Sequence, residues 1–413
     1  MITEPISPKT GKTSLPPEGL ASRRGIWQSW QDRTPLGWLQ LKRQKSRMVV
    51  AVAGIAFADL LMFAQLGIQA ALFDSNTLLL SHLNADIVIR GSQYRDLSLT
   101  TTFPRRRLYQ AQSVEGIAHA DPIYIASVNW KNPQTRHKTQ ITVLGQSLER
   151  PALNLPEIAQ QLDTITLLDT VLFDRLSRGT YQEVVQQVAQ GESVNTEIDR
   201  RTIRVAGLFS LGASFATDGT IVASQDSFLR LFPERTSGQV SLGLLQIKPG
   251  HDPQQVVEAL RVTLPKDVLI NTKLDFLNLE RAYWSQRTPI GLVFNFGTIM
   301  AFVVGIVIVF QILSTDVNDH LAEYATFKAM GYRDRYLLAI VFEEAIILAV
   351  IGFIPGLALA LAQYRLIQVA AALPIGMTAA RLFFVFGLTV LMCCFSGAIA
   401  TRKLQSADPA DIF

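Results

Sequence analysis

Apolar residues along this chain of 413 residues are gathered into long blocks, separated by mixed or polar sequence. A helix of about 20 apolar residues crosses the hydrocarbon core of a bilayer, which is about 30 Å thick. Four blocks reach that length, at 48–73, 289–313, 336–362 and 382–400. A buried core helix is the alternative for each, but such helices usually break before about 18 uncharged residues. We therefore predict an α-helical membrane protein with four transmembrane helices.

The basic residues at the start of the chain predict its orientation. Residues 1–47 carry nine basic and three acidic side chains, a net charge of +6 that suits anionic lipid headgroups. Four of the basic residues directly precede the first block: Lys42, Arg43, Lys45 and Arg47. The positive-inside rule then predicts a multi-pass protein of the inner (plasma) membrane with both termini in the cytoplasm. The first block lacks a small-residue cleavage site and starts too late for a cleaved signal peptide.

Between the first two blocks, residues 74–288 alternate between short strand-like and helix-like runs. Strands are predicted at 86–90, 123–130, 139–144, 201–208, 219–223, 242–247 and 268–271, and helices at 105–112, 181–190, 225–232, 253–263 and 273–284. The segment thus reads as a large extracytoplasmic α+β domain between the first and second transmembrane helices. Its last helix is expected to continue toward the second span as a stalk.

The charge and cysteine content argue against a nucleic-acid-binding protein and against a disulfide-stabilised domain. Residues 74–288 hold 22 basic and 22 acidic residues, so no folded part carries the basic excess of a nucleic-acid-binding protein. The chain's only cysteines, Cys393 and Cys394, lie in the fourth apolar block, so disulfides do not stabilise the outer domain. We expect no nucleic-acid partner.

Candidate catalytic chemistry is sparse. The five histidines are scattered, and no zinc motif or nucleophile elbow is visible. Gly11-Lys12-Thr13 resembles the end of a phosphate-binding loop, but Ile6 stands where that loop needs glycine and no apolar strand precedes it. The triplet Arg105–Arg107 is either a grip for an acidic group or a solvated helix face. We expect a protein that is not an enzyme, with no catalytic residue, no metal site and no cofactor bound by this chain.

Three acidic residues within the apolar blocks are informative because an acid at the bilayer centre costs about 2.5–3.5 kcal/mol. Asp59 lies about 17 Å into the first block at the helical rise. It is either a polar anchor or substrate contact, or a structural partner of Gln65 or of a neighbouring helix. Glu343 and Glu344 lie about 10 Å into the third block, and on a helix they point about 100° apart. At least one is expected to have a fixed structural partner or to reach the cytoplasmic interface.

The loop between the second and third blocks has the pattern of a short amphipathic helix at 318–331. Leu321, Tyr324, Ala325 and Lys328 recur at helical spacing, and Gly331 is suited to end the helix. Such a helix either docks in a groove of a cytoplasmic partner or lies passively at the interface.

Glu323-Tyr-Ala-Thr-Phe-Lys328-Ala-Met-Gly331 resembles the coupling-helix motif of FtsX/MacB-type ABC transporter permeases. Phe342-Glu-Glu344-Ala345 and the closing Asp408-Pro409-Ala410 resemble other motifs of that family, and the order of spans agrees. Shorter motifs look like those of the cyanobacterial DevC permeases: Phe57-Ala-Asp59, Trp130-Lys-Asn-Pro-Gln-Thr, Val171-Leu-Phe-Asp-Arg175, Gly212-Ala-Ser-Phe215 and His320-Leu-Ala-Glu-Tyr-Ala. The resemblance starts near Gln40.

This resemblance implies a dimerising ABC exporter permease, with a second copy of the chain as partner. It also implies a separate DevA-like ATPase that uses ATP, a periplasmic DevB-like adaptor and a TolC-like outer-membrane channel. Such permeases act by mechanotransmission, and DevC systems are associated with glycolipid export. Leu321, Glu323, Tyr324, Lys328 and Gly331 would form the ATPase-coupling helix.

The resulting map has a flexible cytoplasmic tail at 1–35 and a basic flank with the first span at 36–73. The α+β domain follows at 74–288 and an FtsX-like permease domain at 289–413. Two other functions stay open: an FtsX-like transmembrane regulator of a periplasmic hydrolase, and a lipoprotein-extracting permease.

Overall fold

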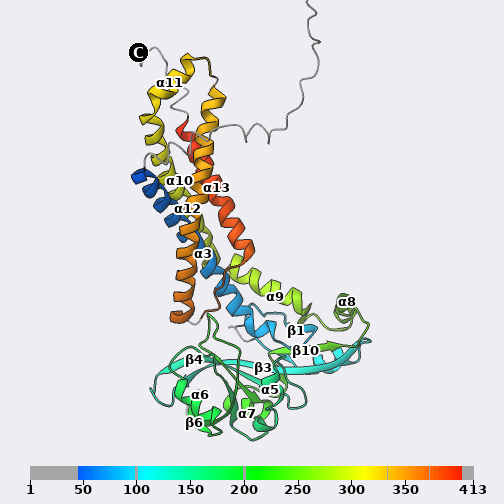
Figure 1. The fold of residues 1–413 in the computed structure, drawn as a ribbon. Coiled ribbons are helices and arrows are strands. Elements are labelled where there is room, and N and C mark those ends of the chain that lie inside the picture. The colour runs from blue at the N-terminus through cyan, green and yellow to red at the C-terminus, as the bar shows by residue number, and fades with distance from the viewer. Residues whose placement is uncertain (1–44, 98–100, 199–200, 333, 372, 402–413) are drawn as a thin grey trace, which may run out of the picture.

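The computed structural model describes residues 45–97, 101–198, 201–332, 334–371 and 373–401. It is elongated, with a bundle of long helices at one end and an α+β domain at the other (Figure 1). The bundle contains α3 (Lys45–Ser81), α10 (Pro289–Asp319), α11 (Leu321–Ala329), α12 (Asp334–Ala371) and α13 (Ala379–Ala400). The predicted tail at 1–35, with its Gly11-Lys12-Thr13, and the closing Asp408-Pro409-Ala410 lie outside the described residues.

Four of these helices are long and apolar enough to cross a membrane, as predicted: α3, α10, α12 and α13. Each is longer than its predicted apolar block, because the helix continues into flanking polar residues. α3 shows this most clearly, since its 37 residues run out of the bundle and reach the sheet of the α+β domain (Figure 1).

Close helix packing in the bundle depends on small residues. α3 contacts each of the other three long helices, and its Ile55 and Ala58 are buried among side chains of α10, α12 and α13. A Cβ atom at Gly352 of α12 would lie 2.7 Å from Cβ of Ile55, and one at Gly305 of α10 would lie 3.0 Å from Cβ of Ala58. Glycine therefore sets the approach of both helices to α3.

The domain is built on a nine-stranded mixed sheet in the order β11-β1-β10-β3-β4-β8-β5-β7-β6. The strands are β1 (Ile87–Gly91), β3 (Ile117–Lys131), β4 (Lys138–Gln146), β5 (Thr170–Asp174), β6 (Val194–Ile198), β7 (Arg201–Phe209), β8 (Thr220–Ser224), β10 (Leu242–Ile247) and β11 (Val268–Thr272). The short strands β2 (Phe103–Pro104) and β9 (Gln239–Val240) pair separately. β3 joins the two halves of the sheet, because its first part pairs with β10 and its second part with β4.

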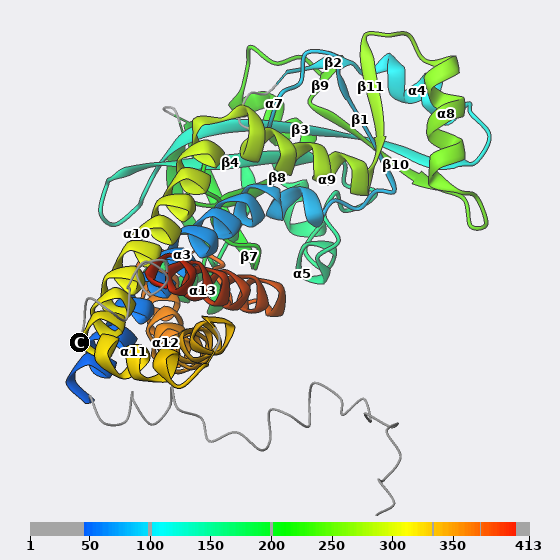
Figure 2. The same ribbon diagram turned by 90° about the horizontal axis from the view of Figure 1, so that it is seen from above.

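Helices cover both faces of this sheet, as Figure 2 shows from above. Alternate residues of a strand point to opposite faces, so Tyr124 of β3 enters one core and Ile125 the other. The first core includes α4 (Arg106–Gln112), α6 (Gln182–Ala189), α7 (Gln225–Leu231) and α8 (Pro253–Thr263). The second includes the end of α3, α5 (Pro156–Ala159), the 3₁₀ turn Asp163–Thr166 and α9 (Lys273–Ala282). The end of α3 is thus part of the domain core.

Two expectations for this domain need correction. Sequence analysis missed the strands β5 and β6: β5 is a short buried strand, and β6 carries the exposed polar residues Asn195 and Glu197. The helix after β11 is also not a continuous stalk. α9 ends at Ala282, a π-helical turn covers Tyr283–Arg287, and Thr288 is extended before α10 begins. Pro289 explains the break, because proline disfavours helical geometry in the residue before it.

Candidate functional site

The connection between α10 and α12 is a helical hairpin with α11 at its tip (Figure 1). His320 ends α10 and begins α11, with φ −97° and ψ 10°. Its backbone N–H donates to the Asp316 carbonyl oxygen at 3.1 Å, and its own carbonyl accepts from the Tyr324 N–H at 3.0 Å. At the far end Gly331 has φ +91°, and its N–H donates to the Lys328 carbonyl oxygen at 2.9 Å. Glycine suits this position because other residues rarely adopt that angle.

The two sides of α11 differ in exposure. Tyr324 is 1% exposed and packs against Val317 of α10 and Val341 of α12. Glu323, with its neighbour Ala322 and with Thr326, is exposed on the other side. Tyr324 therefore joins α11 to both neighbouring helices.

The predicted coupling residues consequently lie in different settings. Glu323 is on the exposed side, whereas Leu321 and Lys328 are partly buried beside Tyr324. Gly331 ends the helix. Glu323 is the charged residue among these five that is exposed, so it is the candidate for direct contact with a partner.

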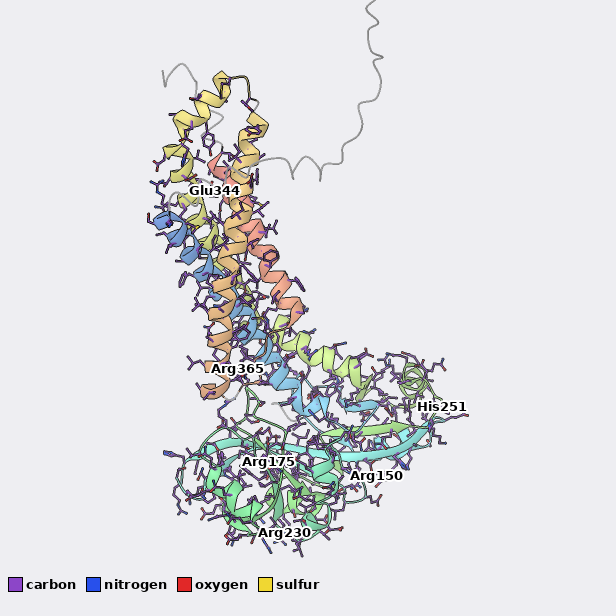
Figure 3. The ribbon with its side chains drawn as sticks, viewed as in Figure 1. Arg150, Arg175, Arg230, His251, Glu344 and Arg365 are labelled. Atoms are coloured by element: carbon purple, nitrogen blue, oxygen red, sulfur yellow. The ribbon has the colours of Figure 1, made fainter. Side chains whose placement is uncertain are left out.

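A pair of buried acids joins α10 to α12 close to this hairpin. Glu344 is 2% exposed, and its carboxyl group lies close to that of Asp316, which is 8% exposed. Figure 3 shows Glu344 within the bundle toward its α11 end. Nδ1 of His320 lies 3.6 Å from Oδ1 of Asp316. Glu343 is half-buried. Of the two adjacent acids, Glu344 is thus the one that faces the bundle interior, beside an acid of α10.

Asp59 is fully buried where three helices meet. Oδ1 of Asp59 accepts a 2.6 Å hydrogen bond from Oγ1 of Thr389 on α13. A Cβ atom added at Gly356 of α12 would lie 2.8 Å from the Cβ atom of Asp59. Gln65, the other partner considered, lies instead against Gly297 of α10. The contact to a neighbouring helix is therefore the one formed. Sequence analysis missed Thr389, although a hydroxyl in an otherwise apolar helix is a signal for such a bond.

At the domain end of the bundle, polar contacts join the two segments that connect the bundle to the domain, namely α3 and the connection from α9 to α10. Arg281 of α9 forms an ion pair with Asp74 of α3 at 3.0 Å. Gln69 of α3 donates to Asn295 of α10 at 3.0 Å. At the opposite end, Arg47 pairs with Asp319, so α3 and α10 are joined at both ends.

Glu280 of α9 is the main electrostatic feature of the domain next to these contacts. It is 2% exposed, and Oε1 accepts hydrogen bonds from the Tyr94 hydroxyl at 2.9 Å and the Leu97 N–H at 2.8 Å. Burial raises the pKa of Glu280 to about 7, although these two bonds oppose the shift. The loop after β1 is thereby fastened to α9.

The arginine triplet is largely structural. Arg107 is buried and binds the Asp267 carboxylate through Nε and Nη2, at 3.0 and 2.7 Å. Arg105 donates to Gln225 at 3.3 Å, and Arg106 is exposed.

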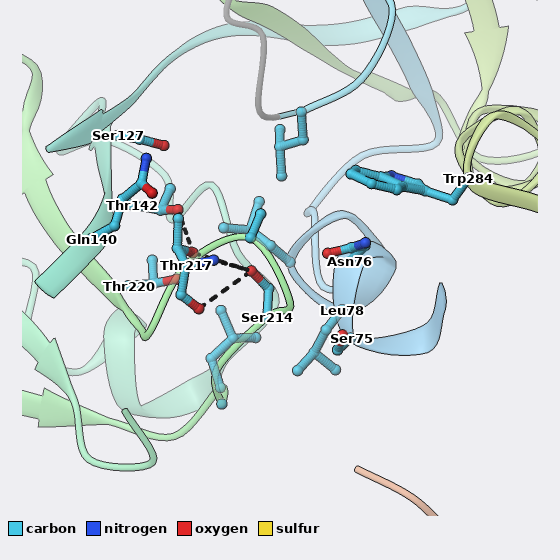
Figure 4. Close-up of a pocket in the computed structure, with 15 residues that line it drawn as sticks. Ser75, Asn76, Leu78, Ser127, Gln140, Thr142, Ser214, Thr217, Thr220 and Trp284 are labelled. Atoms are coloured by element: carbon cyan, nitrogen blue, oxygen red, sulfur yellow. Dashed lines mark hydrogen bonds between the residues drawn. The ribbon is translucent and has the colours of Figure 1, made fainter. Parts of the chain in front are cut away.

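A small cavity lies where the end of α3 and Trp284 meet the sheet (Figure 4). Its volume of about 50 Å³ is too small for a sugar or a lipid headgroup. Its hydroxyl groups bond to one another, as between Thr142 and Thr217 at 2.9 Å. We interpret this cavity as structural.

A larger apolar groove of about 550 Å³ opens between α3 and α10, where the helix bundle meets the domain. Ile68 and Leu72 of α3, Val293 and Phe294 of α10, and the exposed Phe215 of the domain line it. Its size and lining suit an acyl chain.

The C-terminal part of the helix bundle matches a known protein family. Residues 295–409 match the family model described as FtsX-like permease C-terminal. The chain therefore carries an FtsX-like permease domain, which contains most of α10 and all of α11, α12 and α13. The DevC subtype is not established by this match.

Among solved structures, the periplasmic region of MacB from Actinobacillus actinomycetemcomitans is similar at 10% identity. The match covers 48% of this chain and 92% of that one, with a TM-score of 0.31. The extracellular domain of the ABC-type transporter YknZ from Gram-positive bacteria matches at 9% identity, 45% and 99% coverage and a TM-score of 0.30. A comparison with curated protein sequences gave no match.

The bond between Asp59 and Thr389 can be tested with Thr389→Val. The variant leaves a buried carboxylate oxygen without its donor, so we expect it to lower the free energy of unfolding by about 1 kcal/mol. The measurement is thermal or denaturant unfolding of the full chain in detergent. Thr298→Val is the matched control, because Thr298 bonds only to the Phe294 carbonyl within its own helix. Equal effects of the two variants would contradict the interhelical role.

The raised pKa of Glu280 predicts a pH dependence. Between its unfolded value of 4.5 and about 7 the folded protein holds the extra proton, so stability falls as pH rises through this range and is constant above it. Glu280→Gln keeps an oxygen acceptor for Tyr94 and Leu97 and should flatten the curve between pH 5 and 7. The measurement is the unfolding midpoint against pH. The exposed Glu183→Gln on α6 serves as control and should retain the wild-type slope.

Proposed function

We propose that this chain is the permease subunit of an ABC exporter that works by mechanotransmission. The observation that carries the proposal is the position of α11. Its Tyr324 is clamped between α10 and α12, while Glu323 faces solvent. A partner that binds the exposed side of α11 would move two long helices at once. The match of this region to the FtsX-like permease family supports that interpretation.

The motor is proposed to be a separate ATP-hydrolysing subunit of the DevA type, bound on the cytoplasmic side. The basic flank at the start of the chain supports this side for α11, since positive residues favour the cytoplasm. Both termini would then be cytoplasmic, and the α+β domain would lie in the periplasm. A second copy of the chain, a DevB-like adaptor and a TolC-like channel complete the proposed exporter.

Lipid or glycolipid is the proposed cargo class. The apolar groove between α3 and α10 supports it, because the groove lies at the domain end of the bundle and is lined by apolar side chains and one arginine, Arg178. Phe215 lines it from the domain side, where a movement of the domain would alter its width.

Glu323→Lys tests the docking role of α11. Reversing an exposed charge at a partner interface should reduce transport-coupled ATP hydrolysis roughly tenfold, equivalent to about 1.4 kcal/mol. The measurement is ATPase activity of the reconstituted exporter, with insertion of the permease followed by immunoblot. Glu183→Lys, a reversal on the distant helix α6, is the matched control. Full coupled hydrolysis in Glu323→Lys would refute the assignment.

Labelling of introduced cysteines tests the orientation. In a Cys393→Ala/Cys394→Ala background, Ser113→Cys should react with an impermeant maleimide in intact spheroplasts. Thr326→Cys on α11 should react only after permeabilisation, because it would face the cytoplasm. Both positions are exposed in the structure. The reverse pattern would invert the proposed topology.

A further inference from the structure

A cavity of about 650 Å³ lies on the side of the domain that faces the bundle. Its walls come from β1, the turn that follows β1, α9 and the π-helical turn before α10. Three arginines line it: Arg90, Arg95 and Arg287. Their separation along the chain means that the fold, not local sequence, brings them together.

These arginines differ from most others in the domain. The ion pairs of the described residues include seven domain arginines, namely Arg107, Arg150, Arg175, Arg178, Arg230, Arg261 and Arg281. Neither Arg95 nor Arg287 forms an ion pair with any described residue, and both are exposed. The cavity thus brings two arginines without an acidic partner among the described residues together with a third, Arg90.

The acids beside the cavity are already engaged. Glu280 turns Oε1 toward the Tyr94 hydroxyl and the Leu97 N–H. Asp96 is 2% exposed and is not among the residues that line the cavity. Three arginines and one acid, Glu280, therefore line the cavity, and this excess of positive charge favours an anion.

Arg90 is held in place before any ligand arrives. Its Nη1 donates to the Tyr94 carbonyl oxygen at 3.3 Å, and its Nε donates to Asn271 at 3.4 Å. The guanidinium lies 5.4 Å from the centre of the Tyr94 ring and 5.9 Å from that of Phe276. A guanidinium fixed in this way binds an anion with little further loss of side-chain freedom.

The position of the cavity relative to the membrane indicates what kind of anion would bind there. Arg287 lies two residues before Pro289, where the apolar helix α10 begins. Arginine at the end of a membrane-spanning helix lies at the level of the lipid headgroups. A cavity of this volume accommodates a headgroup rather than only an ion.

We propose that Arg90, Arg95 and Arg287 form a binding site for the anionic headgroup of a membrane lipid. The site rests on the proposed function only for its placement at the outer surface of the membrane. Arginine would bind the phosphate oxygens through paired N–H donors, with Tyr283 beside them. Bound lipid would join the domain to the start of α10.

The test is lipid binding to the purified full chain, measured by native mass spectrometry. Phosphatidylglycerol supplies an anionic headgroup, phosphatidylcholine a zwitterionic one, and inorganic phosphate the free anion. Arg95→Gln/Arg287→Gln should weaken phosphatidylglycerol binding roughly twentyfold, since each basic residue near an anionic lipid contributes about a fivefold factor. Arg95→Lys/Arg287→Lys should restore part of the affinity.

Arg201→Gln/Arg204→Gln is the charge-matched control, because both arginines are exposed on β7, near the other edge of the sheet. Equal weakening by this control, or equal binding of the two lipids, would overturn the site. Inorganic phosphate that binds as tightly as phosphatidylglycerol would overturn the lipid as its ligand. Glu323→Lys should leave lipid binding unchanged, so the site and the coupling role of α11 can fail separately.

Discussion

The structure depends on one uninterrupted helix that is buried in two separate cores. Ile55 and Ala58 of α3 pack inside the helix bundle, whereas Leu79 and Leu80 belong to the domain core on the side of the sheet that α9 covers. No loop intervenes between these contacts, so the bundle and the domain share a rigid element. Burial of a leucine side chain contributes about 1.5–3 kcal/mol, and separating α3 from the sheet would expose both leucines.

The second crossing between the bundle and the domain is built differently. α9 and α10 are separated by the π-helical turn and by the extended Thr288, so they form two helices with a joint between them. The ion pair of Arg281 with Asp74 and the hydrogen bond of Gln69 with Asn295 hold this joint beside α3. One crossing can therefore carry a rigid displacement while the other adjusts its angle.

Sequence patterns were sufficient for features that depend on local composition. The four apolar helices and the α+β character of the segment between them follow from hydrophobic periodicity. The partners of the buried acids could not be found in that way. Thr389 is 330 residues from Asp59, and Asp316 meets Glu344 only through the α11 hairpin. Such pairs depend on how the helices pack, and local patterns along the sequence do not reveal that packing.

The arginine cavity shows the same limit. No sequence motif links Arg90, Arg95 and Arg287. The net charge of residues 74–288 is also zero, so the composition does not point to them. Sequence analysis weighed the adjacent triplet Arg105–Arg107 as a grip for an acidic group or a solvated helix face, and Arg107 is in fact buried against Asp267. Whether an arginine is available depends on the acid that packs beside it in the fold.

The buried polar contacts also restrict how the bundle can move. Sliding α3 along α13 by one residue would shift it by about 1.5 Å and break the 2.6 Å bond of Asp59 with Thr389. The carboxyl group would then lie in an apolar setting without its donor, which costs about 1–3 kcal/mol or more if it is charged. Rotation of the helices as one body preserves this bond and the contact of Glu344 with Asp316. A force applied at α11 is therefore expected to tilt the bundle as a unit, with the strain taken up at the joint before α10.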